Sequence, residues 1–199
     1  MNGKSLTKAA QGGFTLIEVM ISMAILTIGS VGLLGVFGVA MAANQTSQED
    51  MIARQLASEA MESIYTARNT SQLSWTQIQN VSNGGIFTDG AISPKCSGAD
   101  GILGTADDTS CLTSGGAVCP NGGVHCMTEP GPDGIIGTSD DVILSLNNYT
   151  RQIQITGLLD TNGSTIPTLN SVTITILYTV PKLNVRKSYI LNEYISSYH

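Results

Sequence analysis

One acidic side chain stands inside the most apolar stretch of the sequence. Glu18 lies four residues after Phe14, near the start of an apolar run of about thirty residues that follows Gly13. A carboxylate within a helix of membrane length is costly unless a partner neutralises it, so such a residue is a functional candidate. A buried carboxylate is tolerated opposite a buried cation. The chemistry indicated is therefore charge pairing inside an apolar assembly.

Residues 13–18 read Gly-Phe-Thr-Leu-Ile-Glu and follow a polar leader, residues 1–13, that carries two lysines. This stretch resembles the cleavage and methylation signature of type IV prepilins and their pseudopilin relatives. The resemblance implies that a prepilin peptidase cuts between Gly13 and Phe14 and then methylates the new N-terminus. It also implies that Glu18 pairs with the free N-terminus of a neighbouring subunit during filament assembly.

Three other interpretations of the same segment compete or coexist with this one. The lysines and the small residues at 40–42 would fit a secretory signal peptide, but the apolar run is about twice the usual length and contains Glu18. An ordinary membrane anchor is the second interpretation. Thr15 and Glu18 also fit a capping box, which is compatible with a role in assembly.

Two kinds of helical pattern follow each other along the chain. Residues 14–43 form an apolar run in which Glu18 is the only charge, and they exceed the roughly 20 residues that cross a bilayer. The two lysines of the leader and the acidic body beyond the span predict a cytoplasmic N-terminus. Residues 44–68 carry a one-sided apolar stripe, which predicts an amphipathic helix continuing onto a globular head. The members of the stripe are Ile52, Leu56, Ala60, Ile64 and Ala67.

The C-terminal part of the head reads as strands. The head is expected at residues 69–199, and its last part, residues 147–199, shows three alternating segments separated by short links. Such a pattern predicts an antiparallel sheet with one face packed and one face wet. The expected fold class is α+β, and the resemblance to pilins implies the same arrangement of a long N-terminal helix packed on an antiparallel sheet.

A segment rich in cysteine, aspartate and glycine, residues 96–142, is expected to be a loop insertion before the sheet. It contains an internal repeat in which residues 98–108 match residues 131–141 at eight of eleven positions. Each copy offers three carboxylates and a hydroxyl on a glycine-rich loop, a set of oxygens that suits Ca²⁺. Asx-turns that cap backbone N–H groups are the alternative. The candidate calcium ligands are Asp100, Asp107, Asp108, Asp133, Asp140 and Asp141.

Four cysteines fall between the two copies or beside them: Cys96, Cys111, Cys119 and Cys126. Cysteines clustered beyond a membrane segment indicate disulfides formed in an oxidising compartment. Four cysteines allow three pairings; the sequential pairing, 96 with 111 and 119 with 126, is the preferred expectation. A zinc site that includes His125 is weakly supported because no pair has C-x-x-C spacing.

Composition excludes several functional classes. The net charge is −6 and no basic patch stands out, which argues against nucleic-acid binding. No nucleophile elbow, P-loop or H-E-x-x-H motif occurs, so an enzyme is not expected and no cofactor beyond the possible calcium is required.

The expected function is that of a minor pilin that is incorporated into a type IV pilus or primes its assembly. Residues 25–35 and 53–62 resemble most the PilV-type minor pilins. The resemblance implies other pilins as partners through the N-terminal helix, an inner-membrane precursor with its head outside the cytoplasm, and a final place on the pilus at the cell surface. The alternatives are a minor pseudopilin of a type II secretion system and, from another class, a secreted calcium-binding protein with a cleaved signal peptide.

Overall fold

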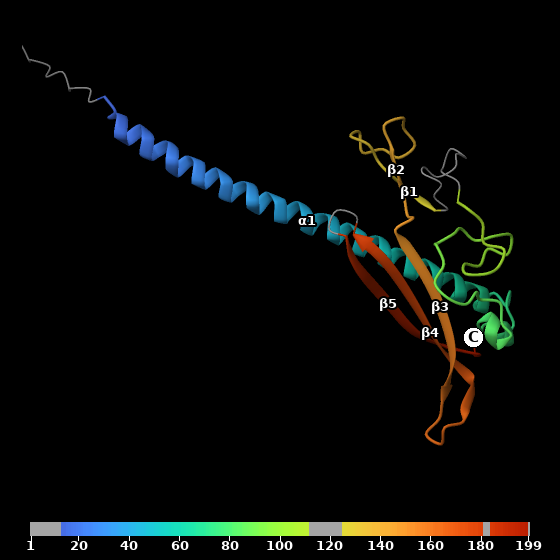
Figure 1. Cartoon of the computed structure of the whole chain (residues 1–199). Coiled ribbons are helices and arrows are strands. Elements are labelled where there is room, and N and C mark those ends of the chain that lie inside the picture. Colours follow the sequence, from blue (N-terminus) through green and yellow to red (C-terminus); the bar gives the residue numbers. More distant parts are fainter. Residues whose placement is uncertain (1–12, 112–124, 181–183, 199) are drawn as a thin grey trace, which may run out of the picture. The chain divides into compact units, whose positions relative to one another are not determined.

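The computed structural model describes residues 13–111, 125–180 and 184–198 (Figure 1). The chain divides into two compact units, Met1–Asn44 and Gln45–His199, which we call the N-terminal and the C-terminal unit. In chain order the elements are α1 (Leu16–Asn69), the 3-10 helices η1 (Trp75–Gln77) and η2 (Val81–Asn83), and the strands β1 (Cys126–Glu129), β2 (Val142–Ser145), β3 (Tyr149–Leu159), β4 (Thr165–Val180) and β5 (Val185–Ser196).

Helix α1 has two different surfaces along its length. The span contains no proline that would interrupt its hydrogen bonds. Its apolar first part has no buried side chain. Beyond Asn44 one stripe becomes buried, which confirms the amphipathic pattern predicted from the sequence. The buried members are Ile52, Ala53, Leu56, Ala57, Ala60, Met61, Ile64 and Ala67.

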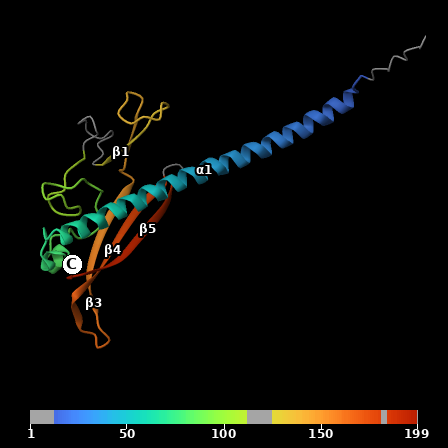
Figure 2. The same ribbon diagram turned by 180° about the vertical axis from the view of Figure 1, so that it is seen from behind.

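The three C-terminal strands form an antiparallel meander in the order β3-β4-β5. Figures 1 and 2 show the later part of α1 lying along one face of this sheet. The predicted α+β class, with a long helix packed on an antiparallel sheet, is confirmed. The Asn162-Gly163 turn links β3 to β4, and Gly163 has a φ of +80°, a conformation that glycine adopts without steric cost.

The core of the C-terminal unit lies between α1 and the inner face of the sheet. Ile64 of the helix and Ile153 and Ile174 of the strands belong to one buried cluster. Ile153 and Ile174 are directly opposite each other in the register of β3 and β4. Strand residues alternate between faces, so the neighbouring threonines of β4 lie on the face turned away from α1.

Polar contacts fasten the start of this helical stripe to the sheet. The Tyr149 hydroxyl donates to the Glu49 carboxylate, and the Tyr178 hydroxyl donates to Asp50. The two tyrosine rings stack with their centroids 5.5 Å apart. Lys187 pairs with Asp50 at 3.1 Å. The hydrogen bond from Tyr178, followed by the contacts with Lys187, lowers the pKa of Asp50 against the opposing effect of burial.

Segments that follow α1 in the sequence and precede the three-stranded sheet cover the outer edge of β3. The buried side chain of Asn80 donates to the Ile153 carbonyl at 2.8 Å and accepts from the Ile155 N–H at 2.7 Å. Ile92 forms an antiparallel bridge with Arg151. These contacts satisfy backbone groups that an exposed edge strand would leave unpaired.

We expected residues 96–142 to be a loop insertion, but part of this segment forms strands. Strands β1 and β2 pair antiparallel as a separate two-stranded sheet, with Cys126 opposite Ser145. The second copy of the repeat, residues 131–141, lies in the connection between them. Each strand has only four residues, too few for alternation to be recognised in the sequence.

Truncation of the helical stripe should destabilise the C-terminal unit selectively. Ile64 is fully buried, so Ile64→Ala is expected to lower the free energy of unfolding by about 2–5 kcal/mol. Ile25→Ala, on the exposed first part of α1, is the matched control and should change it by less than about 0.5 kcal/mol. Urea unfolding in detergent, followed by the fluorescence of Trp75, measures both. Equal midpoints for the two variants would contradict the packing described.

Candidate functional site

The Gly13–Phe14 peptide bond lies just before the first turn of α1. Residues 13–15 are non-helical and exposed, and the helix begins at Leu16. Nothing lies within 4 Å of the position that a Cβ on Gly13 would occupy. A peptidase requires an accessible, non-helical substrate backbone, and the predicted cleavage point has both properties.

Glu18 stands in the first turn of α1. Its backbone N–H donates hydrogen bonds to the Thr15 hydroxyl at 3.4 Å and to the Thr15 carbonyl at 3.1 Å. This is one half of the predicted capping box. Within the described residues, no hydrogen bond or ion pair reaches the Glu18 carboxylate. The carboxylate is therefore available to a group outside the described chain, and the positive end of the helix dipole favours a negative charge in this turn.

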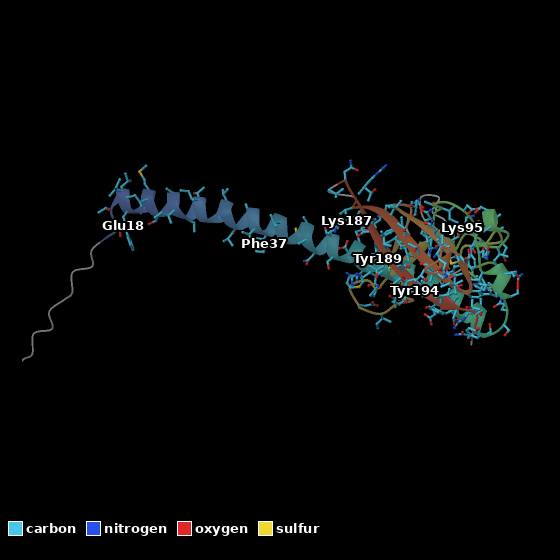
Figure 3. All side chains as sticks on the ribbon, turned by 90° about the horizontal axis from the view of Figure 1, so that it is seen from below. Glu18, Phe37, Lys95, Lys187, Tyr189 and Tyr194 are labelled. Atoms are coloured by element: carbon cyan, nitrogen blue, oxygen red, sulfur yellow. A yellow bond between two sulfur atoms is a disulfide. The ribbon has the colours of Figure 1, made fainter. Side chains whose placement is uncertain are left out.

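An apolar surface surrounds this carboxylate. Phe14, Val19, Ser22, Met23 and Leu26 line a shallow hollow together with Glu18. Figure 3 labels Glu18 and Phe37 on the first part of α1, where side chains project from the ribbon. One 18-residue window of α1 is apolar enough to cross a membrane and has no buried side chain. The exposed apolar surface requires lipid or neighbouring helices to cover it.

The two copies of the repeat have the same local structure. In the first copy the Asp107 carboxylate accepts from the Thr105 hydroxyl at 2.6 Å and from the Asp100 N–H at 3.2 Å. In the second copy Asp140 accepts from Thr138 at 2.6 Å and from the Asp133 N–H at 3.3 Å. These hydrogen bonds, that of the threonine first, lower the pKa of Asp107 and of Asp140.

The remaining aspartates of the repeat are also turn residues. Asp100 and Asp133 each accept from the N–H two residues later at 2.8 Å. Asp108 accepts from the Gly104 N–H at 2.8 Å and Asp141 from the Gly137 N–H at 2.7 Å. All six candidate calcium ligands thus act as caps of backbone groups in the structure described, as the Asx-turn alternative expects.

The carboxylates of neither copy converge on one point. Among the described residues, the one group of three potential ligands whose ligand atoms lie within 4.8 Å of one another is Cys96, Cys111 and His125. Cys96 and Cys111 form a disulfide, so their sulfur atoms are not thiolate ligands. Calcium binding by the repeats stays a prediction, because it requires the carboxylates of a copy to turn towards a common centre.

The disulfide joins the two sides of the first repeat. Cys96 and Cys111, with Cα atoms 5.1 Å apart, flank residues 98–108, in agreement with the first half of the expected pairing. Cys126 is also disulfide-bonded. Its expected partner, Cys119, lies outside the described residues. The burial of His125 lowers the pKa of its imidazole, and the charge of Arg151 adds to that effect.

A buried cation that the sequence analysis did not single out influences Asp108 of the first repeat electrostatically. Arg151 of β3 is 2 % exposed. Burial raises the pKa of Asp108, and the hydrogen bond from the Gly104 N–H and then the positive charge of Arg151 oppose that rise. The alternation of strand β3 could have revealed its burial, because Arg151 lies on the same face of the strand as the apolar residues Ile153 and Ile155.

Comparison with protein-family models matches residues 8–34 to the prokaryotic N-terminal methylation motif. The matched range contains Gly13, Phe14 and Glu18, and it indicates a type IV pilin-like or pseudopilin-like chain that a prepilin peptidase processes. No curated protein and no solved structure matches the chain.

The calcium prediction can be tested by thermal unfolding of the purified chain in detergent. Millimolar Ca²⁺ should raise the melting temperature relative to a chelator, since a ligand that binds only the folded state stabilises it. Asp107→Asn and Asp140→Asn, at equivalent positions of the two copies, should each reduce that rise. Asp160→Asn, in an Asx-turn outside the repeats, is the matched control and should retain it. The absence of any shift would assign the aspartates to turns alone.

Proposed function

We propose that the chain is a minor pilin that enters, or primes the assembly of, a type IV pilus after its leader is removed. The observation that carries the proposal is Glu18, an acid on an exposed apolar helix for which the described chain provides no partner, inside the matched methylation motif. The fold of the C-terminal unit supports it, because a helix continued onto an antiparallel sheet is the arrangement implied by the resemblance to pilins.

The proposed sequence of events follows from the positions of these residues. The precursor spans the inner membrane with its leader in the cytoplasm and its C-terminal unit outside. A prepilin peptidase cuts between Gly13 and Phe14, and methylation of the new N-terminus leaves an amine that still carries a positive charge. A carboxylate and an amine that meet in an apolar environment neutralise each other, whereas each alone would be costly. Glu18 of one subunit would thus pair with the N-terminus of a neighbour.

A pseudopilin of a type II secretion system is the nearest alternative and would use the same chemistry at the same residues. A secreted calcium-binding protein with a cleaved signal peptide is the alternative from another class. It requires cleavage near residue 43, but α1 continues unbroken from Leu16 to Asn69 through this point. The unbroken helix therefore favours the pilin-like proposal over the secreted one. The specific likeness to PilV-type minor pilins belongs to the proposal as well.

The role of Glu18 in assembly can be tested separately from cleavage of the leader. Glu18→Ala should still be cut to mature length but should enter filaments poorly, because the neighbour's amine loses its counter-charge. The loss of one partner of a buried pair costs about 3–5 kcal/mol, which corresponds to about a hundredfold or greater loss of incorporation. The ratio of the chain in sheared filaments to that in membranes measures the effect.

Glu62→Ala is the matched control for this experiment, because Glu62 is an exposed acid on the same helix within the C-terminal unit. It should leave the filament-to-membrane ratio unchanged. Incorporation of Glu18→Ala at the level of this control would argue against the assembly role.

A further inference from the structure

The two copies of the repeat share their turns but not their surroundings. Ile102 and Leu103 of the first copy are 1 % and 4 % exposed. Their equivalents in the second copy, Ile135 and Ile136, are 60 % and 62 % exposed. The same backbone conformation, with the same capping aspartates, thus presents a docked apolar pair in one place and an uncovered apolar pair in the other.

The first copy shows what this motif contacts when it is docked. Ile102 packs in the main core, and the Leu103 N–H donates to the Ser63 hydroxyl at 2.9 Å. Asp108 lies within the electrostatic influence of the buried cation Arg151. A docked copy therefore uses three things: an apolar recess, a hydroxyl acceptor for the N–H of its second aliphatic residue, and a positive charge in the neighbourhood of its last aspartate.

The second copy lacks all three within the described part of the chain. Its aliphatic pair is exposed, and no hydrogen bond is found for the Ile136 N–H. One carboxylate oxygen of Asp141 is buried with no hydrogen-bond donor among the described residues. The copy also carries a net negative charge, since residues 131–141 contain three aspartates and no lysine or arginine.

A groove of about 320 Å³ on the sheet of the C-terminal unit offers these missing groups. It opens beside Leu177, which is 44 % exposed on the face of β4 turned away from α1. Thr150 and Thr179 supply hydroxyls, and Arg186 supplies a cation that forms no ion pair within the described residues. In the strand register Leu177 lies opposite Thr150, and Thr179 lies opposite Arg186, so the four side chains share one face.

We propose that residues 131–141 of one copy dock into this groove on a second copy of the chain. Ile135 and Ile136 would cover Leu177, and Asp140, the exposed aspartate next to Asp141, would face Arg186. The charges are complementary, because the groove residues include no acid. The recess that holds the first repeat is filled by that repeat in each copy, so a second copy offers the groove and not the recess. The contact lies between C-terminal units and does not depend on removal of the leader.

Chemical cross-linking of the full chain in detergent tests the contact. An equal mixture of unlabelled and isotope-labelled Arg186→Lys, which keeps the charge and provides an amine, is treated with a carbodiimide that joins a carboxylate directly to an amine. Peptides of mixed isotope should join Asp140 or Asp141 to position 186. The Asp50–Lys187 pair is an internal control, because its two residues belong to one copy and should give peptides of a single isotope.

An apolar variant then separates docking from chance encounter. Ile135→Ser combined with Ile136→Ser should lower the mixed-isotope yield by roughly tenfold, since each side chain loses apolar burial in the contact. Val81→Ser, at another aliphatic residue that is 53 % exposed, is the matched control and should leave the yield unchanged. The proposal is overturned if mixed-isotope peptides are absent while the Asp50–Lys187 product forms, or if both variants lower the yield equally.

Discussion

The carboxylate of Glu18, for which the described residues provide no partner, is the constraint that explains the N-terminal unit best. It lies on a helix whose first part is apolar on every side and has no buried residue, so neither the charge nor the surface is satisfied within the described chain. Lipid can cover the apolar side chains, but it cannot neutralise the acid. In the proposed account, the α-amine at the start of a neighbouring helix supplies the cation, because it has the appropriate charge and depth.

In the C-terminal unit, by contrast, the apolar side chains of α1 are covered by the same chain. Its stripe of isoleucine, leucine and alanine packs on the inner face of the sheet, and the contacts of Glu49 and Asp50 with Tyr149 and Tyr178 fasten the beginning of that stripe. The two copies of the repeat differ in the same way, since the apolar side chains of one copy are covered and those of the other are exposed. One copy is docked against α1 through Ile102 and the hydrogen bond to Ser63, while the other carries an exposed apolar pair.

The sequence predicted the elements whose apolar pattern repeats over many residues. It missed the features that depend on tertiary partners. The stripe from Ile52 to Ala67 and the three alternating strands were enough to give the α+β arrangement and the antiparallel order. The β1–β2 pair was missed because four-residue strands carry almost no periodic signal. The equivalence of the two repeats was visible, but their different burial was not, because it depends on tertiary contacts with residues distant in sequence, such as Ser63. Cleavage, methylation and the pairing of Glu18 involve other molecules, so they were predicted only through the resemblance of residues 13–18 and stay predictions.

The most direct measurement is the mass of the N-terminal peptide of the chain isolated from filaments and from membranes. The account predicts a peptide that begins with N-methylated Phe14, because the proposed pairing with Glu18 uses a freed N-terminus next to the apolar helix. A chain that retains its first thirteen residues in filaments, or one that begins near Ala43, would contradict the account.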